Sequence, residues 1–89
     1  MKAMDIRVTG RVQGVGFRAW TVQTARRLGV AGWVRNHADM SVLVHAEGED
    51  AAVNAFAGAL GEGPSAAKVD RVAAVPCEAL GCEGFEIRR

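Results

Sequence analysis

The stretch Asp5–Arg18 reads DIRVTGRVQGVGFR, and it combines the end of a strand, a glycine-rich loop and the start of a helix. Residues 5–9 alternate polar and apolar side chains, which is typical of a half-buried strand. Glycines then follow at Gly10, Gly14 and Gly16. Because glycine weakens a strand interior and favours turns, we expect the strand to stop before the first of them.

The rest of the chain shows alternating strand-like and helical spacing of its apolar residues. A helix is predicted over 18–28, with Gly29 as a natural stop, and an amphipathic helix over 49–60. Strands are predicted over 31–36, 41–47 and 68–75, and a short one over 84–88. This β-α-β-β-α-β order with an extra C-terminal strand predicts a ferredoxin-like α+β sandwich, in which two helices cover one face of an antiparallel sheet.

Length and composition favour a single small domain. The chain has 89 residues, 49% of them hydrophobic, so one domain over 1–89 is expected. With 11 basic and 10 acidic residues and an isoelectric point of about 7.9, it lacks the basic character of a nucleic-acid binder. No apolar run could span a membrane and no signal peptide is evident, so we expect a cytoplasmic protein. At this size a monomer is the default expectation.

Two cysteines, Cys77 and Cys82, precede the last predicted strand. We expect free thiols in a reducing compartment. A zinc site usually needs four ligands, and we expect neither His37 nor His45 to complete one with this Cys-x4-Cys pair. The prediction is therefore that the protein holds no metal and no cofactor, and that both thiols are incidental.

The loop Gly10–Arg18 could bind an anion. Its glycines allow positive φ angles, so successive amide N–H groups can point at one ligand. The N-terminus of the following helix also favours negative charge, and Arg18 in the first helical turn adds a planar fork for two phosphoryl oxygens. Spacing alone leaves two interpretations open, a phosphate site and a glycine-rich connection without such a role.

Two motifs resemble the acylphosphatase family. The first is Gly10-Arg11-Val12-Gln13-Gly14-Val15-Gly16-Phe17-Arg18, which matches the family pattern Gly-Arg-Val-Gln-Gly-Val-x-Phe-Arg. The second is Gly32-Trp33-Val34-Arg35-Asn36, followed after a short turn by Ser41-Val42. The resemblance covers nearly the whole chain. It departs from the family at His37, where Thr is common, and at Asp39-Met40, where Asp-Gly is common.

The resemblance implies a metal-free hydrolase of the carboxyl–phosphate bond of small acyl phosphates. By position in the motifs, Arg18 would bind the phosphoryl group and Asn36 would orient the attacking water. The substrate-binding cradle would be Gln13, Gly14, Val15, Gly16 and Phe17. The neighbouring His37 is expected to be a solvated loop side chain, and the role of Arg11, attracting anions or pairing on the surface, stays open.

Three other classes of protein are alternatives to an acylphosphatase. The resemblance extends to acylphosphatase-like modules of hydrogenase-maturation carbamoyltransferases, which would lack free-standing activity; the length and the Met1 start favour a stand-alone protein. An RNA-binding module of the same topology needs stacking aromatic residues, which the strands over 5–9 and 41–47 lack. A ligand-sensing domain would have no reason to combine Arg18 with Asn36.

Overall fold

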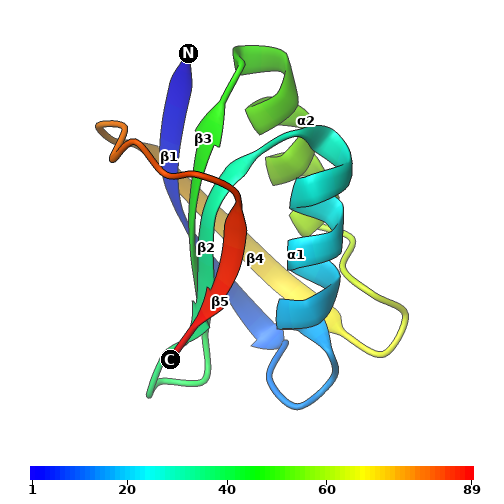
Figure 1. The fold of residues 1–89 in the computed structure, drawn as a ribbon. Coiled ribbons are helices and arrows are strands. Elements are labelled where there is room, and N and C mark those ends of the chain that lie inside the picture. The colour runs from blue at the N-terminus through cyan, green and yellow to red at the C-terminus, as the bar shows by residue number, and fades with distance from the viewer.

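The computed structural model describes residues 1–89. It has seven elements: five strands that form one sheet, and two helices (Figure 1). In chain order they are β1 (Lys2–Arg11), α1 (Phe17–Leu28), β2 (Ala31–Asn36), β3 (Val42–Gly48), α2 (Asp50–Leu60), β4 (Lys68–Pro76) and β5 (Phe85–Arg88). The strand order is β4-β1-β3-β2-β5. Both helices lie on one face of the sheet, so the predicted ferredoxin-like sandwich is confirmed. No helix is long and apolar enough to cross a membrane.

The sheet is mixed, which corrects the expectation of an antiparallel one. The pairs β1–β3, β1–β4 and β2–β3 are antiparallel, but β5 pairs with β2 in parallel. Because β4 and β5 occupy opposite edges of the sheet, the chain must cross between them. Residues 77–84 make that crossing on the face away from the helices, as the orange segment of Figure 1 shows.

Strand β1 is longer than predicted, and Gly10 belongs to it. The strand continues to Arg11 because it pairs with β3 at its beginning and with β4 along most of its length. Its register with β4 shifts between Thr9 and Gly10. At this irregularity Gly10 has φ 122°, and a Cβ there would lie 2.2 Å from the carbonyl oxygen of Lys68. Here glycine permits close strand packing rather than ending the strand.

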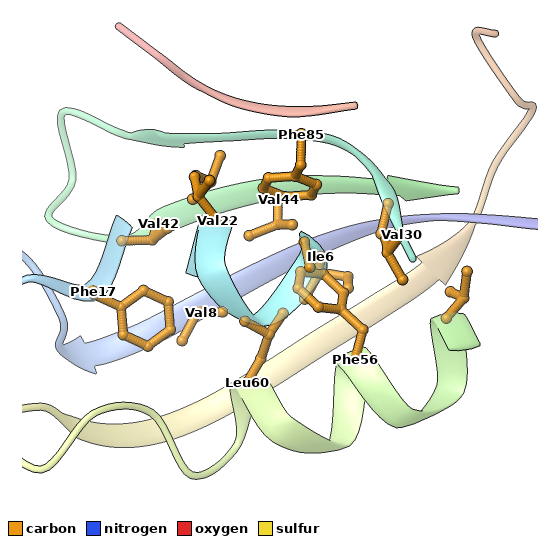
Figure 2. Packing of buried hydrophobic residues seen from close by; sticks show 14 of the residues in the cluster. Ile6, Val8, Phe17, Val22, Val30, Val42, Val44, Phe56, Leu60 and Phe85 are labelled. Atoms are coloured by element: carbon orange, nitrogen blue, oxygen red, sulfur yellow. The ribbon is translucent and has the colours of Figure 1, made fainter. Parts of the chain in front are cut away.

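The core lies between the sheet and the helices. Alternate residues of the strands, such as Ile6 and Val8 of β1, point to this side and are buried. Figure 2 shows Phe17 toward one end of the cluster and Phe56 packed near Phe85, with the rings of the latter pair 5.6 Å apart, edge to face. Since Phe17 is also the first residue of α1, the core fixes where that helix begins.

Helix α1 ends where the sequence predicted. Gly29 follows its last residue with φ 76°, and its N–H donates to the carbonyl of Arg26 at 3.3 Å. The next N–H, of Val30, donates to the carbonyl of Ala25 at 2.9 Å. This pair of bonds satisfies carbonyls at the helix end and directs the chain into β2.

We expect Gly32→Ala to destabilise the fold by at least about 3 kcal/mol, because its φ is 143° and a Cβ would lie 1.8 Å from the carbonyl oxygen of His45. Gly58→Ala is the matched control. Gly58 is exposed on α2 with open space around a Cβ, so the change should stabilise by about 0.5–1 kcal/mol. Urea unfolding measures both, and equal stability of Gly32→Ala and the wild type would contradict the close packing of β2 on β3.

Candidate active site

Three segments meet at one end of the molecule: the loop after β1, the turn between β2 and β3, and the C-terminus (Figure 1). The loop and α1 form one wall of a cavity of about 180 Å³. The lining residues are Val12, Gly14, Gly16, Phe17, Arg18, Ala19, Asn36 and Ile87. A wider opening of about 710 Å³ adjoins it and is lined by Arg18, Asn36, Ile87 and Arg89.

The loop has the backbone geometry of an anion cradle. Gly14 and Gly16 have φ 74° and 76°, and a Cβ on either would meet no atom within 4 Å. Gly16 is also the N-cap of α1, and no side chain accepts a hydrogen bond from the first amides of that helix. These N–H groups and the helix dipole therefore favour a bound anion. Val12 and Phe17 are buried, which anchors both ends of the loop in the core.

Arg18 provides the cation of the site. It lies in the first turn of α1 and lines both the narrow cavity and its wider opening. None of the ion pairs of the chain involves Arg18, so its guanidinium is available to a ligand. Two oxygens of one phosphoryl group match such a fork.

Asn36 faces the same cavity from the end of β2. It lies on the same side of the strand as the fully buried Val34, two residues earlier, and therefore on the helix side of the sheet. Its Oδ1 atom is buried without a hydrogen-bond partner in the protein. An unpaired buried acceptor costs free energy unless a water or a ligand supplies the missing hydrogen bond.

Gln13 connects the two sides of the site through its side chain. Its Nε2 donates to the carbonyl oxygens of His37 at 2.8 Å and Ser41 at 2.9 Å. The sequence indicated a place for Gln13 in the cradle but not this bridge to the turn after Asn36. The bridge could not be recognised without knowing which carbonyls the turn presents to the loop. Val15, another predicted cradle residue, packs against the core instead of lining the cavity.

Asp39 organises the turn between β2 and β3. Its carboxylate accepts from the Ser41 hydroxyl and, at 3.0 Å, from the Ser41 N–H; it also pairs with Arg7 and His37. The Ser41 hydrogen bonds, with help from the charge of Arg7, lower the pKa of Asp39 to about 2. These contacts hold Met40 at φ 75°, a left-handed conformation that usually requires glycine. The ring of His37 thus helps to stabilise the turn through its contact with Asp39.

The structure leaves Arg11 out of the cavity. Its side chain is exposed at the end of β1 and makes no ion pair, so the surface-pairing alternative is not supported.

The sequence missed a second polar cluster, toward the other end of the sheet. We expected no association of the histidines with the cysteines, yet Cys77 Sγ lies 3.7 Å from Nδ1 of His45. His45 also contacts Asp5 and Glu47 and is only 2% exposed. Alternation along β3 places His45 and Glu47 on one face, but only the strand pairing puts Asp5 opposite His45.

Comparison with known proteins identifies one family. The family model described as acylphosphatase matches residues 4–87. The acylphosphatase of Rhodospirillum rubrum is 47% identical over 85 residues, covering 96% of this chain and 93% of its own. The acylphosphatase of Thermotoga maritima is 47% identical over 88 residues, covering 99% and 98%.

Solved structures show the same likeness. The crystal structure of acylphosphatase from Bacillus subtilis superposes with a TM-score of 0.96 at 37% identity, covering 100% of both chains. Full-length HypF, solved in a phosphate- and nucleotide-bound form, contains a region that matches with a TM-score of 0.88 at 27% identity; it covers 99% of this chain and 12% of HypF. Sequence and structure therefore agree that the chain belongs to the acylphosphatase family, the enzymes that hydrolyse acyl phosphates.

Proposed function

We propose that the enzyme hydrolyses small acyl phosphates without a metal ion, using Arg18 and the loop amides to hold the phosphoryl group and Asn36 to orient water. The observation that carries this proposal is the buried, unpaired Oδ1 of Asn36 in the same cavity as Arg18 and the glycines Gly14 and Gly16. A carboxamide beside an anion cradle can hold a water molecule against a bound phosphoryl group.

The reaction divides between the two sides of the cavity. Arg18 and the amides of the loop and of α1 stabilise the negative charge on the phosphoryl oxygens as the bond to the carboxylate breaks. Asn36 Oδ1 accepts a hydrogen bond from the attacking water, which directs the water oxygen at phosphorus. The new P–O bond forms, the carboxylate leaves with the electrons of the broken bond, and a phosphoryl oxygen takes the proton of the water. A carboxylate is a stable anion, so no acid is needed to assist its departure.

The cradle grips only the phosphoryl end, which supports a broad tolerance of acyl groups. Cys77 and Cys82 are free thiols, which supports the reducing cytoplasm as the compartment.

A direct test is the hydrolysis of benzoyl phosphate in the presence and absence of excess EDTA. We expect turnover with both and competitive inhibition by inorganic phosphate, since the cradle should bind free phosphate as well. Loss of turnover on chelation, with recovery after a divalent ion is added back, would show that the cation of the reaction is not Arg18.

Substitutions should separate the roles of Arg18 and Asn36. Arg18→Ala should raise KM and reduce kcat sharply, and Lys should restore little because it lacks the bidentate fork. Asn36→Ala should lower kcat about a hundredfold, the scale of one lost hydrogen-bonding group, with KM and phosphate inhibition near wild type. Steady-state kinetics on variants shown to be folded by circular dichroism gives both values.

Arg35→Ala is the matched control for these variants. It removes the same charge as Arg18→Ala from the next strand, but its side chain lies near Trp33 on the face away from the cavity. Its kinetics should equal those of the wild type. If Asn36→Ala abolished phosphate binding and left kcat unchanged, Asn36 would belong to the cradle and not to the water.

The bridge from Gln13 can be tested separately. Gln13→Ala removes both hydrogen bonds to the turn, each worth about 1 kcal/mol net, so we expect a fall in kcat of about tenfold or more as Asn36 loses its position. Gln13→Asn should do no better, because the shorter side chain cannot reach both carbonyls. Phosphate should still inhibit both variants. Wild-type kcat in both would show that the turn holds its place without the bridge.

A further inference from the structure

The cluster around His45 lies on the face of the sheet opposite the helices, beneath the crossing segment 77–84 (Figure 1). His45 projects from the central strand β3 and is 2% exposed. Its two ring nitrogens have different surroundings. Nε2 lies 2.7 Å from Glu47 Oε2, and Nδ1 lies 2.9 Å from Asp5 Oδ1 and 3.7 Å from Cys77 Sγ.

Both carboxylate oxygens of Glu47 accept hydrogen bonds from other residues of the protein. Its Oε1 accepts from the N–H of Cys82 at 2.6 Å, and its Oε2 accepts from the N–H of Leu80 at 2.8 Å and from His45. Burial alone would raise the pKa of Glu47, but these hydrogen bonds outweigh it and lower the pKa. Because an ionised Glu47 accepts from Nε2–H, it fixes the ring orientation and directs Nδ1 toward Asp5 and Cys77.

The Nδ1 side therefore gathers three ligand atoms of different chemistry around one point. At 2.9 Å, Nδ1 of His45 can donate a hydrogen bond to Asp5, and a metal ion would take the place of that proton. A histidine whose other nitrogen donates to a buried carboxylate is a recurring arrangement in metal sites, because the carboxylate orients the ring and raises its basicity. Glu47 supplies that arrangement here.

We propose that Asp5, His45 and Cys77 form a binding site for a zinc ion, with water as the fourth ligand. Bonds of about 2.0–2.3 Å in a tetrahedron place ligand atoms roughly 3.3–3.6 Å apart. The separations of 2.9 and 3.7 Å lie close to that range, and the three ligand atoms all lie within 4.8 Å of one another. The Asp5 side chain is 56% exposed, so it can adjust, and it gives the ion a path from solvent.

The donor set selects the class of ion. A thiolate and an imidazole suit zinc and its transition-metal relatives, whereas magnesium and calcium prefer oxygen ligands only. Binding exchanges two protons, one from Nδ1 of His45 and one from Cys77, for one divalent cation. Two positive charges leave and two enter, so the net charge of the cluster is unchanged.

Cys82 provides an internal comparison. It joins His45 and Glu47 on the Nε2 side of the ring, where a second set of three potential ligands meets. Both Glu47 oxygens there already accept backbone N–H groups, and displacing them would release the crossing segment. On the Nδ1 side, metal binding would displace no backbone N–H group. The ion would join β1, β3 and the segment after β4, far from Arg18, and would stabilise the fold without entering the reaction.

Cobalt is a suitable probe, because a cobalt–thiolate bond gives a charge-transfer absorption band in the near ultraviolet. Titration of the reduced wild-type chain should give this band with one ion per chain, and zinc should displace the cobalt and raise the unfolding temperature. Cys77→Ser should lose the band, whereas Cys82→Ser, the matched control, should keep it. Asp5→Asn should bind cobalt at least tenfold more weakly.

Benzoyl phosphate hydrolysis should be the same for zinc-loaded and metal-free enzyme and for both serine variants, which also shows that the variants are folded. Absence of the cobalt band, or of any shift in unfolding temperature with zinc, would overturn the proposal. So would a band that survives in Cys77→Ser and disappears in Cys82→Ser. None of these results bears on Arg18 or Asn36, so this inference and the proposed catalytic mechanism can fail independently.

Discussion

The two hydrogen bonds from Gln13 Nε2 to the carbonyls of His37 and Ser41 join the glycine-rich loop to the turn after Asn36. The proposed phosphate cradle belongs to the loop between β1 and α1, whereas Asn36 belongs to β2, and neither segment neighbours the other in sequence. In the proposed mechanism the position of Asn36 matters, because a displacement of about 1 Å can reduce a rate a hundredfold. The half-buried amide of Gln13 bridges both segments and is uncharged, so it would not compete for a bound anion.

The same end of the molecule depends on the core beneath it. Val12 and Phe17 are 1% exposed and enclose the loop from both sides, so the glycines between them can take positive φ angles without making the loop mobile as a whole. The turn after Asn36 uses another device. Its left-handed residue is Met40 and not glycine, and the strain is offset by the hydrogen bonds and ion pairs of Asp39. Packing thus supports one wall of the site, and polar contacts support the other.

Most of the fold could be predicted from the sequence, because it depends on local patterns, whereas Asn36 was singled out only by the resemblance to the acylphosphatase motifs. Apolar spacing located both helices and most strand boundaries, and the glycine loop followed by Arg18 indicated an anion site. The direction of β5, the continuation of β1 through Gly10 and the bridge from Gln13 could not be predicted. Each depends on a partner far away in sequence: the free edge of β2, the carbonyl of Lys68, or the turn at His37. The cluster around His45 was missed for the same reason, since Asp5 and Cys77 reach it only through strand pairing.

The two faces of β3 would allow the proposed zinc ion and the proposed metal-free catalysis to coexist in so small a protein. Val42, Val44 and Ala46 point toward the helices and build the core on which the cradle rests, and the groups facing the substrate there are backbone amides, a guanidinium and a carboxamide. Amides and guanidinium groups donate hydrogen bonds and carry or favour positive charge, so that end attracts anions and repels cations. His45 and Glu47 point to the other face, where carboxylates and a thiol gather around an imidazole. The alternation of β3 therefore places the proposed cation site on the opposite face of the sheet from the proposed anion site, and neither ligand would compete for the groups of the other.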